Sequence, residues 1–153
     1  MAKYLLVVDV QREFVKDRFG EKVYGKCLNY IAEHRNEYSA VIAAVYVNKD
    51  NPNMQRLLNW DECKRIELLD FIPDIQIEHS GYSIKEYPYV QKTDTIDIIG
   101  FDTDACVLSA CFHIFDLGCG MNILTELMWS SGGKKMHEAG LTVMKRQFGK
   151  AVK

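Results

Sequence analysis

Continuous apolar runs of strand length recur along the chain and are separated by more polar stretches. Runs of this kind, rich in β-branched residues, are typical of strands buried on both faces of a parallel sheet. They predict strands at residues 3–10, 39–48, 74–79, 94–101 and 121–128. The run at 74–79 is short and alternates polar with apolar positions, whereas the run at 94–101 is a stronger strand pattern.

Between these runs, apolar residues recur at the three- and four-residue spacing of one helix face. This pattern predicts helices at residues 21–34, 104–118 and 134–149, and one or two short helices within 54–71. Because strands and helices alternate from end to end, we expect an α/β fold: three layers around a doubly wound, mainly parallel sheet of Rossmann-like type. Residues 1–153 are expected to form a single domain.

Composition narrows the functional classes. The net charge of −2 provides no basic field, so we expect neither a nucleic-acid partner nor binding to an anionic membrane surface. No apolar run reaches the ~20 residues that would cross a bilayer. The five cysteines are odd in number and include no Cys-x-x-Cys pair, which favours reduced thiols and a cytoplasmic protein.

Candidate chemistry lies where predicted strands end, because sites in open α/β sheets form beyond the carboxyl ends of strands. Asp9, residues 48–50, His79 and residues 102–106 follow four successive strands. Several of these could meet in one crevice.

Cys106 opens a predicted apolar helix, which is a favourable place for a reactive thiol. A helix N-terminus carries partial positive charge and free N–H groups, so we expect it to lower the pKa of the thiol and to hold an oxyanion. By position alone, Asp9 is a candidate proton acceptor, and His79 or Lys85 is a candidate cation.

Three motifs of this chain resemble those of the isochorismatase-like cysteine hydrolases, a family related to the nicotinamidases, and they follow the family's order along the sequence. "VVDVQREF" is similar to the family's first motif, and "GFDTDACV" resembles its nucleophile motif, Gly-x-x-Thr-x-x-Cys-Val. "HSGYS" looks like the region that normally reads Lys-x-x-Tyr-Ser, and residues 125–141 resemble the closing strand, loop and helix. The resemblance covers nearly the whole chain and implies the isochorismatase-like fold.

The resemblance also implies residue roles. Cys106 matches the nucleophile, Asp9 matches the acid/base, and the backbone N–H groups of Asp102 and Cys106 match an oxyanion hole. The Phe101–Asp102 bond matches a cis peptide that would aim the Asp102 amide into the site. Gln11 and Phe14 match positions near the mouth of the substrate pocket.

The implied activity is hydrolysis of a non-peptide C–N bond in a small amide-like substrate, through a covalent Cys106 intermediate and without a cofactor. A homo-oligomer is also implied, by analogy alone. The sequence does not identify the substrate, because the loops that would select it, residues 48–60 and 82–93, depart most from the family pattern.

One departure concerns the cation. The family's lysine falls on His79, whose ordinary pKa of ~6.5 makes it a conditional cation and predicts a pH-dependent activity near neutrality. Either His79 or Lys85 takes the role of that lysine, or the triad is broken. A broken triad would make the chain a catalytically silent ligand- or partner-binding protein, and a redox-sensing thiol is a third alternative.

A second departure concerns metal. The nicotinamidases of this family hold a metal after the second strand with an aspartate and several histidines. Residues 47–63 contain no histidine, and Asp50 alone cannot hold an ion that needs about four ligands. We therefore expect no metal site and no metal-dependent nicotinamidase.

Overall fold

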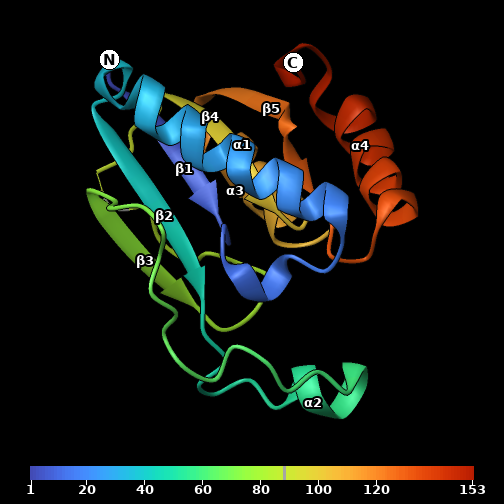
Figure 1. Ribbon diagram of the computed structural model, residues 1–153. Helices are drawn as coiled ribbons and strands as arrows, with labels where there is room; N and C mark the ends of the chain where they lie inside the picture. Colours follow the sequence, from blue (N-terminus) through green and yellow to red (C-terminus); the bar gives the residue numbers. More distant parts are fainter. Residues whose placement is uncertain (88) are drawn as a thin grey trace.

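The computed structural model describes residues 1–87 and 89–153, in which five strands form one parallel sheet (Figure 1). The strands are β1 (Lys3–Val8), β2 (Ala40–Tyr46), β3 (Ile75–His79), β4 (Thr95–Phe101) and β5 (Gly120–Trp129). Their order in the sheet is β3-β2-β1-β4-β5, and every neighbouring pair is parallel. Each of the five strand predictions is confirmed, with ends that move by one to two residues.

Helices cover both faces of this sheet. They are α1 (Arg18–His34), α2 (Asn53–Leu58), α3 (Cys106–Leu117) and α4 (Lys134–Phe148), and short 3-10 turns occur at Arg12–Phe14, Arg35–Glu37 and Gly149–Ala151. Helix α1 crosses one face of the sheet, and α3 lies behind it with α4 at its side (Figure 1). The predicted three-layer α/β class is therefore confirmed. Among the described residues, no helix is long and apolar enough to span a membrane.

The two faces bury separate hydrophobic cores. On one face, Leu5 and Val7 of β1 pack with Tyr24 and Cys27 of α1. Leu6, whose side chain points to the opposite face, belongs to the core that α3 and α4 cover. This alternation explains why β1 reads as a continuous apolar run, since both of its faces are buried.

The strand order places a switch point at the centre of the sheet. The chain moves from β1 outward through β2 to β3, and then returns to the other side of β1 as β4. Binding sites of doubly wound sheets form at such a point, beyond the carboxyl ends of the strands. The residues that follow β1, β3 and β4 are therefore brought to one edge (Figure 1).

The prediction for residues 54–71 is only partly right. A helix forms at Asn53–Leu58, and Asn59 ends it with a left-handed φ of 54° while its N–H donates to the Gln55 carbonyl at 3.0 Å. Residues 59–74 then run without a helix. Their polar side chains make long-range contacts instead, for example from Asp70, which accepts a hydrogen bond from the Tyr24 hydroxyl at 2.6 Å. The spacing of apolar residues along a helix does not predict such long-range contacts.

Helix α1 begins three residues earlier than the apolar spacing predicts. Asp17 caps it, and the Asp17 carboxylate accepts a hydrogen bond from the Gly20 N–H at 2.6 Å. A capping aspartate satisfies one of the free N–H groups of the first turn, so the helix extends back to that residue.

Two glycines allow the close approaches that build the site edge. A Cβ on Gly100 would lie 1.9 Å from the Val8 carbonyl oxygen, and the Gly100 φ of +130° also favours glycine. A Cβ on Gly140 would lie 2.9 Å from backbone atoms of Thr103 and Asp104, so its absence lets α4 pack directly against the loop before α3. Both contacts hold the loop that carries Cys106.

Candidate active site

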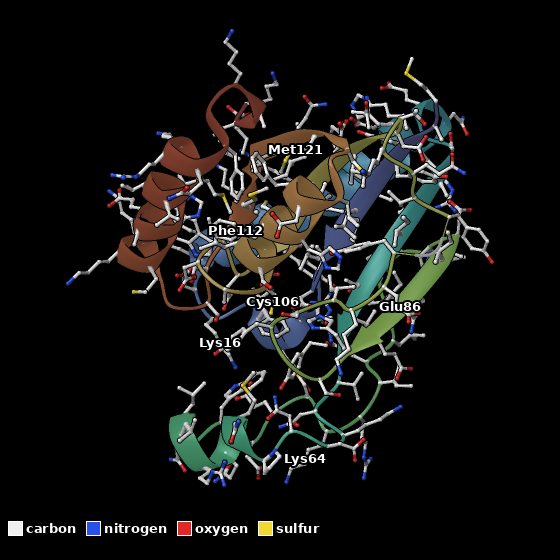
Figure 2. The ribbon with its side chains drawn as sticks, turned by 180° about the vertical axis from the view of Figure 1, so that it is seen from behind. Lys16, Lys64, Glu86, Cys106, Phe112 and Met121 are labelled. Atoms are coloured by element: carbon white, nitrogen blue, oxygen red, sulfur yellow. The ribbon has the colours of Figure 1, made fainter. Side chains whose placement is uncertain are left out.

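Three residues that are far apart in the sequence meet at the carboxyl edge of the sheet. Asp9 follows β1, His79 ends β3 and Cys106 begins α3. One carboxylate oxygen, one imidazole nitrogen and the sulfur all lie within 4.8 Å of one another. The residues are 0%, 5% and 5% exposed, respectively. Figure 2 shows Cys106 at the end of α3 that faces this edge.

His79 is held by an acceptor on each ring nitrogen. Its Nε2 lies 2.6 Å from Asp9 Oδ1, and its Nδ1 lies 2.7 Å from the Gly81 carbonyl oxygen. A carbonyl can only accept, so Nδ1 carries a proton, and an ionised Asp9 requires a second proton on Nε2. The arrangement therefore suits an imidazolium that donates to both partners.

Electrostatics favour the same protonation state. Burial alone lowers the pKa of His79, but the hydrogen bond and negative charge of Asp9, together with the Gly81 carbonyl, outweigh burial and raise it above its ordinary value. His79 thus forms a buried ion pair with Asp9 and is the cation that the described structure brings to this carboxylate.

Cys106 differs from the sequence-based expectation. Burial raises the pKa of the thiol well above its ordinary value, and the nearby Asp9 carboxylate raises it further. The expected lowering by the helix N-terminus is therefore outweighed, and the resting sulfur is a protonated thiol. Deprotonation of this thiol requires a base at hand.

Asp9 is placed to be that base. Its Oδ1 accepts from His79, while its Oδ2 is buried and has no hydrogen-bond partner among the described residues. The backbone of Asp9 is left-handed, with φ of 47°, and its N–H donates to the Ala44 carbonyl at 2.9 Å. An aspartate tolerates this conformation better than most residues, and such backbone is frequent at functional sites.

The loop before α3 presents two N–H groups beside the thiol. The Phe101–Asp102 peptide is cis, as the resemblance implied. Neither the Asp102 N–H nor the Cys106 N–H has a hydrogen-bond acceptor within residues 1–87 and 89–153. The Asp102 side chain turns the other way, where Ser131 donates to it from its N–H at 2.7 Å and from its hydroxyl at 2.5 Å. Burial raises the pKa of this carboxyl to about 6.

A second histidine steadies the same loop. His137 of α4 lies against the ring of Trp129, with centroids 4.7 Å apart, and its Nδ1 is 2.7 Å from the hydroxyl of the buried Thr103. Burial lowers the pKa of His137, which favours a neutral ring in this hydrogen bond with Thr103. The helical pattern at residues 134–149 does not predict this contact, because it depends on how α4 packs against the loop before α3.

Lys85 does not join the cluster. It is exposed on the loop after β3, where it borders an open hollow together with His79, Gly81 and Tyr82. The structure therefore brings His79, and not Lys85, to Asp9.

Gln11 and Phe14 are buried near the site but do not present polar groups to it. The Gln11 amide donates to the Tyr46 carbonyl at 3.0 Å, and its oxygen accepts from the Tyr46 N–H at 2.8 Å. Gln11 therefore ties the end of β1 to β2, in contrast to the expected position at a pocket mouth. Phe14 packs against the rings of Tyr46 and Trp60, with centroids 6.2 and 5.8 Å apart.

Two tyrosines that the sequence did not single out surround the cluster. The Tyr46 ring meets the His79 ring edge-on at 5.4 Å, and the Tyr46 hydroxyl is buried without a partner among the described residues. Tyr82 is half-exposed and borders a hollow on each side of its loop. Burial raises the pKa of Tyr82, and one of its two hollows is also lined by Ala105, the residue before Cys106. The pairing of Tyr46 with His79 across parallel strands could have identified Tyr46.

Comparison with known proteins adds the fold relationship. No protein-family model and no curated protein matches the sequence. Among solved structures, the nicotinamidase of Bacillus subtilis superimposes with a TM-score of 0.76 at 17% identity, over 99% of each chain. An isochorismatase-like hydrolase from Alkaliphilus metalliredigens gives a TM-score of 0.75 at 18% identity, over 95% of this chain and 92% of that one.

A third similar structure is the N-carbamoylsarcosine amidase of Thermoplasma acidophilum. Its TM-score is 0.74 at 19% identity, over 100% of this chain and 96% of that chain. The motif resemblance in the sequence is therefore matched by similarity of the whole architecture. The chain has the fold of the isochorismatase-like hydrolases.

Proposed function

We propose that this protein is a cysteine hydrolase that cleaves a non-peptide C–N bond in a small amide-like substrate. The observation that carries the proposal is the position of Asp9 between His79 and Cys106. Its Oδ1 accepts from His79, its Oδ2 has no hydrogen-bond partner among the described residues, and the Cys106 sulfur lies within 4.8 Å of the other cluster atoms. A carboxylate between a cation and a thiol can take up and return one proton.

The first half of the reaction forms a thioester. Asp9 Oδ2 takes the proton from Cys106, and the sulfur attacks the substrate carbonyl carbon. The negative charge that develops on the carbonyl oxygen is stabilised by the N–H groups of Asp102 and Cys106. Collapse of this intermediate breaks the C–N bond, and the amine leaves with the proton from Asp9.

The second half regenerates the thiol. Asp9 accepts a proton from water as the water oxygen attacks the thioester carbonyl. The acid is released, and the proton on Asp9 returns to the sulfur. His79 stays protonated throughout, and its positive charge stabilises the thiolate that forms in each half. No step needs a metal or an organic cofactor.

The open hollow bordered by His79, Gly81, Tyr82 and Lys85 is the proposed entrance for substrate. Its volume of about 770 Å³ lies within the range of pockets that bind small molecules. The structurally similar proteins named above as a nicotinamidase and an N-carbamoylsarcosine amidase support a small amide as the substrate class.

The test is ammonia or amine release from a panel of small primary amides and carbamoyl compounds. We expect turnover by the wild type, loss of turnover in Cys106→Ala, and a trapped acyl-enzyme detected by intact-mass spectrometry in the wild type. Asp9→Asn should abolish both turnover and the covalent adduct. Lys22→Ala serves as the control and should retain turnover, because Lys22 is exposed on α1 and belongs neither to the cluster nor to the lining of the hollow. A panel-wide absence of turnover and of adduct would reject the hydrolase.

The second candidate is a catalytically silent binding protein. The near-complete burial of Cys106, at 5% exposure, is the observation that favours it. A silent protein would bind an amide from the panel with unchanged affinity in Cys106→Ala and would form no adduct. Cytoplasmic location and a homo-oligomeric state stay predictions of the sequence, and light scattering on the purified protein tests the latter.

A further inference from the structure

The three clustered side chains are also a complete set of transition-metal donors. A cysteine sulfur, an imidazole nitrogen and a carboxylate oxygen are the ligand types that zinc prefers. Here the three donor atoms lie within 4.8 Å of one another, and all three residues are buried. In addition, Asp9 Oδ2 is fully buried and has no hydrogen-bond partner among the described residues. An unpartnered buried carboxylate oxygen is costly unless something occupies it.

The surroundings of His79 match those of a metal ligand. A ligating histidine usually donates its second ring N–H to a carbonyl or carboxylate, which fixes the tautomer. His79 does so through Nδ1, which lies 2.7 Å from the Gly81 carbonyl oxygen. The Nε2 atom is thereby directed at Asp9 and is the atom left to coordinate.

The separation of the donors is close to what one ion needs. Tetrahedral zinc with bonds of about 2.0 to 2.3 Å keeps its ligand atoms roughly 3.3 to 3.8 Å apart. The present spread of up to 4.8 Å must contract slightly, while the His79–Asp9 distance of 2.6 Å must open as the ion replaces the shared proton. Both shifts are within the reach of side-chain rotation.

We propose that Asp9, His79 and Cys106 bind one divalent transition-metal ion of the zinc class, with solvent as the fourth ligand. Binding displaces two protons to solvent, one from the sulfur and one from Nε2, and forms one bond to each donor atom. The ion binds the lone pair of the sulfur that would attack the substrate. It also binds the Asp9 carboxylate that would accept the thiol proton, so it blocks nucleophilic attack. This inhibition rests on the proposed hydrolase function, whereas the binding itself does not.

The histidine is what creates this site. A lysine ammonium at the same position, as in the family motif that the sequence resembles, donates protons and has no lone pair for a metal. The site also differs from the one expected in nicotinamidases after the second strand, because residues 47–63 contain no histidine. Within the described residues, the Asp9, His79 and Cys106 cluster is the one group of three such donors in reach of a common ion.

Cobalt(II) is the probe, because its spectrum reports thiolate coordination and tetrahedral geometry directly. Protein freed of metal by a chelator and then dialysed is titrated with Co²⁺, and Zn²⁺ is added afterwards to displace it. We expect one equivalent of Co²⁺ to produce a thiolate-to-cobalt charge-transfer band and strong visible bands. Cys106→Ser should remove the charge-transfer band, and Asp9→Asn should weaken affinity by roughly a hundredfold or more. Cys119→Ser, which removes a thiol outside the cluster, should behave as the wild type.

The variant His79→Lys tests the metal site alone. It should lose Co²⁺ and Zn²⁺ binding, because an ammonium has no lone pair for the ion, while its circular dichroism spectrum shows that it is folded. Metal binding by the wild type, together with no amide turnover by the metal-free wild type, would reject the hydrolase and leave the metal site standing. Turnover without a cobalt–thiolate band would reject the metal site, as would a band that survives in Cys106→Ser or in His79→Lys.

Discussion

His79 Nε2 lies 2.6 Å from Asp9 Oδ1, although the two residues end strands that are separated in the sheet by β2. The imidazole therefore reaches across the end of β2, where its ring meets Tyr46 edge-on. Gly81 holds the other ring nitrogen, so the position of the imidazole is defined on both sides. This contact makes His79 the partner of Asp9 and gives rise to the predictions that follow.

Substitutions of His79 should show whether turnover needs the positive charge of this side chain or only its hydrogen bonding. His79→Lys restores a permanent cation and should retain turnover, while His79→Gln keeps hydrogen bonding but removes the charge. We expect the glutamine variant to lose turnover by two to three orders of magnitude (a loss of ~3 to 4 kcal/mol of transition-state stabilisation), since a buried thiolate then has no counter-charge. Steady-state kinetics on the best substrate of the amide panel measure both variants. Equal activity of His79→Gln and wild type would refute the role of the cation.

The same pair predicts how stability depends on pH in chelator-treated protein. Because the folded-state pKa of His79 is raised above the unfolded value of ~6.5, the pair's contribution is fully present below that value. It is lost as pH rises through the folded pKa. The difference in unfolding free energy between wild type and His79→Gln should therefore shrink as pH is raised above neutrality. Urea unfolding at a series of pH values measures it, and a difference that grows with pH would contradict the ion pair.

Tyr82 should control access to the thiol. Its ring is half-exposed beside two hollows, one of which is also lined by Ala105, whereas the adjacent Cys106 is 5% exposed. Tyr82→Ala should increase the rate of Cys106 alkylation by iodoacetamide several-fold, read by peptide mass spectrometry. Phe115→Ala, which removes an exposed aromatic ring elsewhere, should leave that rate unchanged. An unchanged rate in Tyr82→Ala would show that another segment covers the sulfur.

Gln11 should matter for stability through its two hydrogen bonds to Tyr46. Gln11→Met keeps a side chain of similar length but leaves the buried Tyr46 N–H and carbonyl unpaired. We expect a loss of about 2 to 4 kcal/mol in the free energy of unfolding, because each unsatisfied buried group costs about 1 to 3 kcal/mol. Chemical denaturation measures the loss. A substrate-binding role without a structural one would instead raise KM and leave the unfolding free energy unchanged.

Gly140 should be intolerant of a side chain where another helical glycine is tolerant. A Cβ at Gly140 would meet the Thr103 and Asp104 backbone at 2.9 Å, so Gly140→Ala should destabilise the fold by about 1 to 3 kcal/mol. It should also disturb the loop that carries Cys106. Gly25 of α1 has nothing within 4 Å of its added Cβ, and Gly25→Ala should stabilise the fold by about 0.5 to 1 kcal/mol. Thermal and chemical unfolding of the two variants compare them, and equal effects would refute the close helix contact.

Much of the fold follows from local patterns in the chain. The apolar run at residues 3–10 and the β-branched run at 39–48 are strands because only a sheet covered on both faces buries such residues continuously. The apolar spacing predicts the start of α1 three residues late, because a capping residue is one polar side chain and not part of a periodicity. The helical prediction fails at residues 59–74 because their side chains make contacts with distant residues such as Tyr24.

Some properties of the candidate site follow from the sequence, and others follow only from the tertiary structure. The sequence by itself determined the residue types and their places after strands, and these are enough to predict Asp9, His79 and Cys106 as candidates. Only the tertiary structure decided that His79 rather than Lys85 contacts Asp9. It also decided that the Gln11 amide is hydrogen-bonded to the Tyr46 backbone. It also reversed the expected direction of the Cys106 pKa, because burial and a neighbouring carboxylate are properties of the packed molecule. Residue chemistry is local, whereas dielectric surroundings and partners exist only once the strands are assembled.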